Sequence, residues 1–478
     1  MRAPSYLVHA PLTAAWANRS LDVLFAQSLS SGAQIFLPTD SAWANETQAR
    51  WSDYQAPTYL GAIKPATEED IQIIVKISQA NNIPFFATGG GHSFSDYSNF
   101  EGISIELGNF NTTVLGNSNT TLTIGGAVKF EQLYDLLYDA GKELPFASCA
   151  CPGVVGTTLG AGLGPLQGHR GLMIDALQSV RLITADGDLI TASEDENPEL
   201  FWGIRGAGSN FGIVTSASFK LYDITNAGQA MVAQMVFPAS ANGNYWKVLQ
   251  SLDSTLPSKL ALTNMAYYAT EYNMTLIVLN AIYFGPQEEG EPHLQAFKDL
   301  EPLQTSITMT PQNLLFPNIF GSCTPNQHIN IYTVAITETD PATLETVFDD
   351  FQTMWTTYSG YQGRLLIQRF PNDAVVGSVS ENATAFPWRD AVAHVSIEGY
   401  MTDTSLYAVV DRFERSVRDR LAVTSGYPHL ATYTNFARGT EGPVAWYSVR
   451  KLPALAALKE KWDPKGLFGF NKPIPTQK

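Results

Sequence analysis

The sequence predicts an α+β protein with two domains, one of which contains an antiparallel sheet covered by helices on one face. Strand and helix signals alternate through about residue 222, around loops dense in glycine. From about residue 225 to 430 glycine becomes rarer, and long runs of alternating polarity are separated by helical stretches. With 478 residues the chain is also too long for one simple core.

The first clear element of the N-terminal part is a helix near residue 70. Thr67 followed by Asp70 is typical of an N-cap with an acidic first turn, and Ile71, Ile74 and Val75 follow at helical spacing. Residues 1–58 are expected to be irregular with helical patches. Further along, strands are expected at 83–87, 103–107, 122–126 and 180–184, an amphipathic helix at 130–138 and a hairpin turn at 185–188.

Residues 225–430 carry the longest strand and helix signals. The alternating runs at 274–283 and 328–336 predict strands, whereas 341–358 and 405–422 predict helices. Beyond residue 430 one more helix is expected at 453–462, because Asp463–Pro464 is a helix stop.

Composition limits the kinds of partner. The net charge of −16 and the pI of about 4.8 would repel a polyanion such as nucleic acid. No apolar run reaches the roughly 18 residues of a membrane span, so we expect no membrane insertion. Acidity of this size also simply favours solubility. We expect a monomer that acts on a small molecule.

Six Asn-x-Ser/Thr tripeptides favour the secretory pathway, although some such tripeptides arise by chance. Arg2 and Ala15–Ala17 match the n-region and cleavage site of a secretory signal, although His9 and Pro11 interrupt the stretch between them. We therefore expect a secreted, N-glycosylated protein. The tripeptides begin at Asn18, Asn45, Asn111, Asn119, Asn273 and Asn382.

The chain has three cysteines, Cys149, Cys151 and Cys323, which are too few for a scaffold built on disulfides. A zinc site fits poorly, since it needs four ligands and neither a second Cys pair nor a His-x-x-x-His is present. We expect no metal, and we expect Cys323 to be an ordinary core or loop cysteine.

Three glycine-rich segments indicate a site for an anionic ligand with a flat ring. Gly89–Gly91 follow a strand and let backbone N–H groups approach an anion, although alone they also fit a tight turn. In Leu159–Gly164 the alternate glycines suit an extended backbone lying against a ring or phosphates. In residues 197–214 a glycine-spaced turn runs into a strand. None of the three matches a Rossmann or Walker pattern.

These segments resemble the FAD domain of the vanillyl-alcohol-oxidase superfamily, of the berberine-bridge-enzyme-like kind common in fungi. That family shows Gly-Gly-His-Ser, a Cys-containing glycine loop, Leu-Phe-Trp-x-x-Arg-Gly-x-Gly-x-Asn-Phe-Gly-Ile, Tyr-x-Asn and a closing aromatic-Asp-Pro motif. All five occur here in that order, over residues 56–223 and 430–475. The resemblance implies a two-subdomain PCMH-type FAD-binding domain (1–224), an inserted substrate-binding domain (225–430) and a segment that returns to the FAD domain (431–478).

The resemblance also implies that FAD is bound covalently, through its 8α-methyl to His92 and through its ring position 6 to a cysteine. An alignment without gaps to Gly160–Gly162 favours Cys149, whereas Cys151 followed by Pro152 copies a common family pair, so both remain open. The other cysteine is expected to be a small buried hydrophobe. The remaining flavin-binding residues implied are Gly89, Gly90, Gly91, Ser93, Gly153, Gly156, Thr157, Gly160, Gly162, Gly208, Asn210, Gly212, Ile213, Val214, Tyr433, Asn435 and Asn471.

Oxidation of a C–H bond beside a hydroxyl needs a base for the proton while hydride goes to flavin N5. Tyr433 belongs to the Tyr-x-Asn segment that faces the flavin in relatives. Glu398 stands on a predicted strand, where relatives carry Glu, Gln or Asp near the substrate. Both are candidate catalytic residues, and the alternatives are a packing tyrosine and a glutamate on a strand surface.

The third residue after the linking cysteine helps to control oxygen access in this family. It is Pro152 if the link is Cys149, or Val154, a residue found in oxidases, if the link is Cys151. We expect O₂ to be the electron acceptor, so that H₂O₂ is the second product.

The leading hypothesis for the substrate is a small organic alcohol or a secondary-metabolite intermediate. Phe316, Phe320, Phe370 and Trp388 would line a pocket for an aromatic substrate, or else form core. One alternative is a carbohydrate oxidase that makes lactones. Another is an oxidative cyclase, or a binding protein whose FAD is structural.

Overall fold

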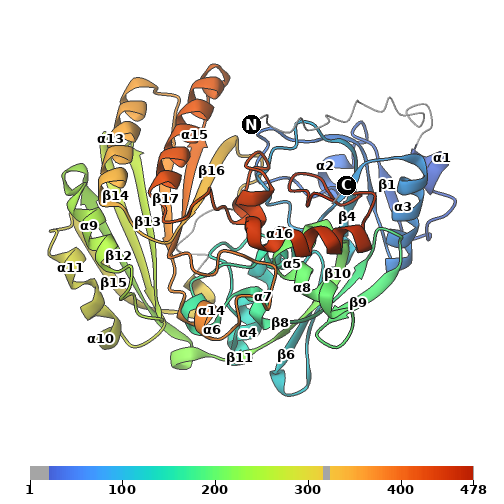
Figure 1. Ribbon diagram of the computed structural model, residues 1–478, viewed down its shortest axis with the longest axis horizontal. Helices are drawn as coiled ribbons and strands as arrows, with labels where there is room; N and C mark the ends of the chain where they lie inside the picture. Colours follow the sequence, from blue (N-terminus) through green and yellow to red (C-terminus); the bar gives the residue numbers. More distant parts are fainter. Residues whose placement is uncertain (1–20, 316–322, 477–478) are drawn as a thin grey trace.

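The structure is a computed structural model that describes residues 21–315 and 323–476. Two halves lie side by side, one with the glycine-rich segments and one with a large sheet (Figure 1). The signal-like segment, Asn18, Phe316 and Phe320 lie outside the described residues. No helix within the described ranges is long and apolar enough to cross a bilayer.

The glycine-rich half contains two main sheets. In the first, with strand order β1-β2-β4-β3, β2 and β3 run parallel to β4, whereas β1 is antiparallel to β2. The second, with order β5-β6-β10-β8-β9, is antiparallel. The strands are β1 (Gln34–Phe36), β2 (Thr58–Lys64), β3 (Phe85–Thr88), β4 (Glu101–Glu106), β5 (Thr113–Leu115), β6 (Thr121–Gly125), β8 (Leu177–Ile183), β9 (Leu189–Ser193) and β10 (Ile213–Lys220), with a small pair β7 (Lys142–Glu143) and β11 (Tyr222–Asp223).

Helix α3 (Glu68–Asn81) packs on the first sheet and begins as predicted. Asp70 N donates to Thr67 Oγ1 at 3.2 Å, and Thr67 N donates to the Asp70 carboxylate at 3.0 Å. This reciprocal pair satisfies N–H groups of the first turn that have no partner within the helix. Ile71 and Ile74 are fully buried, in one cluster with Ile103 of the sheet. The predicted strands of this half are confirmed as β3, β4, β6 and β8.

The expected helix at 130–138 is divided into a 3-10 turn, Phe130–Gln132, and α4 (Tyr134–Asp139). The other helices of this half are short. They are α1 (Leu21–Phe25), α2 (Trp43–Glu46), α5 (Val154–Gly160), α6 (Gln167–Arg170), α7 (Met173–Ala176) and α8 (Pro198–Ala207).

The second half is an antiparallel sheet in the order β15-β12-β14-β13-β17-β18-β16, as predicted. Helices cover one face, where Trp246, Phe351 and Val417 pack on sheet residues such as Ile367 and Val395. The strands are β12 (Gln229–Pro238), β13 (Leu260–Ala269), β14 (Met274–Tyr283), β15 (Gln304–Pro311), β16 (Ile329–Ile336), β17 (Arg364–Arg369) and β18 (Ala393–Tyr400). The helices are α9 (Asn244–Ser251), α10 (Gln287–Gly290), α11 (Gln295–Lys298), α13 (Pro341–Thr357), α14 (Asp373–Gly377) and α15 (Tyr407–Val423).

The C-terminal segment carries α16 (Pro443–Trp462), which lies over the glycine-rich half (Figure 1). Its buried Trp446 and Leu455 share a cluster with Leu200 of α8. The helix was predicted to span only 453–462. Instead it continues back to Pro443, with non-helical backbone at Ser448.

Candidate functional site

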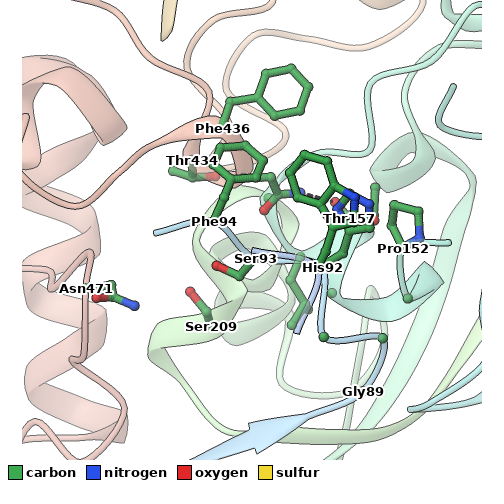
Figure 2. Close-up of a pocket in the computed structure, with 18 of the residues that line it drawn as sticks. Gly89, His92, Ser93, Phe94, Pro152, Thr157, Ser209, Thr434, Phe436 and Asn471 are labelled. Atoms are coloured by element: carbon green, nitrogen blue, oxygen red, sulfur yellow. Dashed lines mark hydrogen bonds between the residues drawn. The ribbon is translucent and has the colours of Figure 1, made fainter. Parts of the chain in front are cut away.

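A cavity of about 670 Å³ lies where the glycine-rich half meets the sheet face that the helices leave uncovered. Its volume is within the usual range for small-molecule and cofactor sites. Figure 2 shows His92, Pro152 and Thr157 together on one side of this cavity, with Asn471 on the other. Its walls come mainly from the segments 85–94, 147–163, 206–214, 364–368, 396–400, 433–436 and 467–472.

The Gly89–Gly91 loop touches the cysteine loop, at Pro152 and Gly153, backbone to backbone. A Cβ atom on Gly90 would collide with the backbone nitrogen of Gly153, so no larger residue fits there without displacing a loop. Gly156 differs, because beyond its chain neighbours and the backbone of its own helix no atom lies within 4 Å of the position where its Cβ would stand. Gly156 lines the cavity and is exposed to it. The space above Gly156 therefore has room for a flat group.

The segment Leu159–Gly164 is not extended, contrary to the prediction. Its start belongs to helix α5, and Gly162 turns the chain with a φ of 74°. The alternate glycines serve packing within the protein, since a Cβ on Gly160 would collide with the side chain of Asn435, and one on Gly162 with Met173. Glycine spacing alone could not reveal these contacts, because both partners are distant in sequence or across a turn.

His92 lies flat against Trp51, with ring centroids 4.5 Å apart and planes at 11°. Its Nε2 is 3.9 Å from the Sγ of Cys149. Burial lowers the pKa of His92 to about 4, so the imidazole is neutral at pH 7 and keeps a nucleophilic lone pair. Burial raises the pKa of the Cys149 thiol. The two loops thus bring two nucleophilic side chains to one wall of the cavity.

Cys151 forms a disulfide with Cys323, which is 172 residues away in the chain and has its Cα at 5.5 Å. Cys151 is buried, as expected, but it is bonded rather than a free hydrophobe, and the expectation of an ordinary cysteine at 323 is wrong. No local pattern signals a pair so far apart. Cys149 remains a free thiol. Pro152 lines the cavity, whereas Val154 is fully buried and does not.

Tyr433 is buried at the cavity wall, and its hydroxyl is held by the α5 region. The phenol oxygen accepts hydrogen bonds from Gly162 N at 3.0 Å and from Asn435 Nδ2 at 2.7 Å, and it donates to Thr157 O at 3.3 Å. Burial raises its pKa although these N–H donors oppose that effect, so the phenol is protonated at neutral pH. This geometry makes Tyr433 an anchor of the Tyr-x-Asn segment.

The uncovered face of the sheet presents a charged cluster to the cavity. Arg364 and Glu398 are cross-strand partners on β17 and β18, and Arg364 Nε donates to Glu398 Oε2 at 2.5 Å. Tyr400, two residues further along β18, donates to the same oxygen at 3.4 Å. Burial and then the Glu398 charge raise the pKa of Tyr400, so the phenol stays a donor. The glutamate side chain is only 7% exposed.

A hydrogen bond also connects this sheet face to the cysteine loop. Gln368 on β17 donates from Nε2 to Ser148 Oγ at 2.9 Å. Ser148 directly precedes Cys149, so the sheet helps to fix the position of the free thiol.

Most of the predicted site residues line the cavity. Cys151, Gly162, Gly208 and Asn210 do not. Asn210 instead holds the C-terminal segment, donating to Tyr447 Oη at 2.9 Å and accepting from Ile474 N at 3.2 Å. The predicted residues that do line it are Gly89, Gly90, Gly91, His92, Ser93, Cys149, Gly153, Gly156, Thr157, Gly160, Gly212, Ile213, Val214, Glu398, Tyr433, Asn435 and Asn471.

Sequence reasoning missed several lining residues. Arg50 and Trp51 lie in a segment predicted only as irregular, and no local pattern marks them. Tyr400 had a usable signal, since it shares a strand face with Glu398 two residues away. The aromatic residues Phe370 and Trp388 are buried and do not line the cavity, which agrees with the alternative that they form core.

Comparison with known proteins gives a consistent result. Residues 59–193 match the family described as FAD binding domain, and residues 432–475 match the family Berberine and berberine like. FAD-linked oxidoreductase tazG of Aspergillus terreus is 48% identical, over 96% of each chain. FAD-linked oxidoreductase azaL of Aspergillus niger is 43% identical, over 93% of this chain and 96% of the relative.

Solved structures of lower identity share the fold. Physcomitrella patens BBE-like 1 superposes with a TM-score of 0.84 at 19% identity, covering 96% of this chain and 99% of that one. Xylooligosaccharide oxidase from Myceliophthora thermophila superposes with a TM-score of 0.83 at 21% identity, covering 96% of this chain and 100% of that one. Glucooligosaccharide oxidase from Acremonium strictum superposes with a TM-score of 0.83 at 19% identity, covering 96% of this chain and 99% of that one. That enzyme is described with a 6-S-cysteinyl, 8α-N1-histidyl FAD.

Proposed function

The chain belongs to the berberine-bridge-enzyme-like FAD-linked oxidoreductases, and we propose that it is an oxidase whose FAD is attached through both His92 and Cys149. One observation carries this proposal: a neutral imidazole and a free thiol lie 3.9 Å apart on the cavity wall. The 8α and 6 positions belong to the same ring of the flavin, so neighbouring side chains suit them. The solved glucooligosaccharide oxidase pairs the same two residue types.

The remaining residues of the cavity fit FAD. Gly156 leaves space for a flat ring, and the cations Arg50 and Lys472 line the cavity and would offset the two charges of a diphosphate. Bound FAD would supply a two-electron acceptor. Each covalent attachment would replace one hydrogen of the flavin and one of the side chain with the new bond. The two electrons and two protons released by each attachment would pass to O₂.

Filling the space above Gly156 should prevent flavin binding. We expect Gly156→Leu to lower the flavin-to-protein ratio strongly, because the leucine side chain would occupy the open space above residue 156 that a flat ring needs. Gly377→Leu is the matched control, since Gly377 also lies in a helix with open space around it but outside the cavity. Absorbance near 450 nm relative to 280 nm measures the ratio. Equal flavin content in both variants would contradict the assignment.

We assign the proton acceptor to Glu398. It faces the cavity from the sheet, and its partners Arg364 and Tyr400 both donate to one oxygen, Oε2, leaving Oε1 without a bond from either of them. Tyr433 is the second candidate, but its phenol is protonated and already bonded to backbone groups. We propose that Tyr433 positions the Tyr-x-Asn segment and that Glu398 takes the proton from the substrate hydroxyl.

We propose a small organic alcohol, such as a secondary-metabolite intermediate, as the substrate and O₂ as the acceptor. The charged cluster on the sheet suits a hydroxyl-bearing substrate. A carbohydrate is the second candidate, since solved relatives include xylooligosaccharide and chitooligosaccharide oxidases. A panel of alcohols, phenolic alcohols and oligosaccharides with peroxide detection separates them. A panel member that bleaches the flavin anaerobically without forming H₂O₂ in air would indicate a dehydrogenase instead.

We also propose a secreted, N-glycosylated monomer. Asn45, Asn111, Asn273 and Asn382 are exposed, and the Cys151–Cys323 disulfide suits an oxidising compartment. Treatment of the secreted fungal protein with an endoglycosidase should therefore increase its gel mobility. An unchanged mobility, together with an unglycosylated intact mass, would overturn this proposal.

A further inference from the structure

Three sulfur atoms lie close together at the proposed flavin attachment. The Sγ of Cys149 is 3.8 Å from the Sγ of Cys151, which is itself bonded to Cys323. The Sγ of Cys149 is also 3.9 Å from His92 Nε2. The free thiol thus has two potential covalent partners within reach, the flavin and its neighbouring cysteine.

The far end of the disulfide is anchored independently of any ligand. Just after Cys323, Asn326 N donates to Arg50 O and Gln327 N donates to Trp51 O, both at 2.8 Å. Trp51 is the residue stacked on His92. The disulfide therefore joins the cysteine loop to a segment that backbone hydrogen bonds hold against the histidine side of the same wall.

We propose that the Cys151–Cys323 disulfide reserves Cys149 for the flavin by removing Cys151 as a competing partner. This inference rests on the proposed attachment through Cys149. Without Cys323, two thiols two residues apart would be free in an oxidising compartment. Their pairing would remove one hydrogen from each and reduce a disulfide oxidant, such as glutathione disulfide, to two thiols.

When the Cys151 thiol and FAD compete for Cys149, the neighbouring thiol is favoured. A group held on a short tether has an effective concentration of about millimolar, whereas free FAD must first find the site. In the wild-type protein Cys149 could pair with Cys151 only by expelling Cys323 from the existing disulfide. Exchange would also be reversible, since the expelled Cys323 sulfur is anchored beside the pair.

The test compares Cys323→Ser with the double variant Cys151→Ser/Cys323→Ser, both secreted into medium buffered with glutathione disulfide. Both lack the cross-link, but only the single variant keeps a competing thiol. In Cys323→Ser we expect flavin on His92 alone, a Cys149–Cys151 disulfide in non-reduced peptide maps, and a roughly tenfold or larger loss of flavin on Cys149. In the double variant we expect attachment at both residues.

Flavin on Cys149 in Cys323→Ser at the wild-type level would overturn the proposal, as would an equal loss of that attachment in both variants. If Cys323→Ser is not secreted, wild-type protein made under riboflavin limitation is reduced, reoxidised with glutathione disulfide and then given FAD. A Cys149–Cys151 disulfide in the fraction that lacks flavin on Cys149 supports the proposal, and its absence contradicts it. The peptide map of the wild-type protein tests the proposed attachment separately. Absence of flavin from Cys149 in that map would refute the attachment itself.

Discussion

Replacing Glu398 with glutamine should lower the rate of flavin reduction by about 10²- to 10⁴-fold, the usual contribution of a positioned general base. The amide keeps the size of the side chain but cannot accept the substrate proton. The cavity wall that carries His92 and Cys149 is untouched, so flavin content and spectrum should match the wild type. Anaerobic stopped-flow measurement of flavin bleaching isolates this step from reoxidation.

Arg364→Gln provides the matched control, because it breaks the same 2.5 Å ion pair but leaves the carboxylate in place. We expect it to retain at least about tenfold more activity than Glu398→Gln, which corresponds to about 1.4 kcal/mol in the barrier. If the two variants lose activity equally, the loss comes from breaking the ion pair, and Glu398 is not the base. If Tyr433→Phe is the more damaging change while its flavin content is normal, the base is Tyr433.

Replacing His92 with alanine should leave FAD attached only through Cys149 and should reduce turnover at least about tenfold. Loss of one attachment lowers the flavin potential, and each 30 mV lost costs about 1.4 kcal/mol of two-electron driving force. The ring should still bind, because the glycine loops and the Cys149 thiol remain. Peptide mass mapping identifies the attachment site, and spectroelectrochemistry measures the potential.

His169→Ala is the control for replacing a histidine of lowered pKa, since His169 is partly buried but does not line the cavity. It should change neither the attachment sites nor the potential. A His92→Ala protein with an unchanged potential and two remaining attachments would show that another residue binds the 8α position.

Local sequence patterns predicted the regular elements well. The Thr67 and Asp70 pair marks the start of α3, because a capping box depends only on residues three apart. The alternating run at 274–283 coincides with β14, which is buried inside its sheet. Both signals are set by neighbours along the chain, so no knowledge of tertiary contacts is needed.

Features that depend on tertiary contacts were not predictable in this way. The disulfide between Cys151 and Cys323 and the stacking of Trp51 on His92 join segments that only the fold brings together. The mistaken extended backbone at 159–164 has the same origin, because its glycines pack against Asn435 and Met173. The motif residues were placed near the cavity by resemblance, whereas Arg364 and Tyr400 required the register of β17 and β18.

Mass mapping of the flavin adduct in wild-type protein identifies the residues that hold the flavin. After acid precipitation and proteolysis, we expect a single flavin-bearing species that joins the peptide containing His92 to the peptide containing Cys149, with Cys151 recovered as a disulfide with Cys323. Flavin released into the acid supernatant, or a flavin adduct on Cys151, would contradict it.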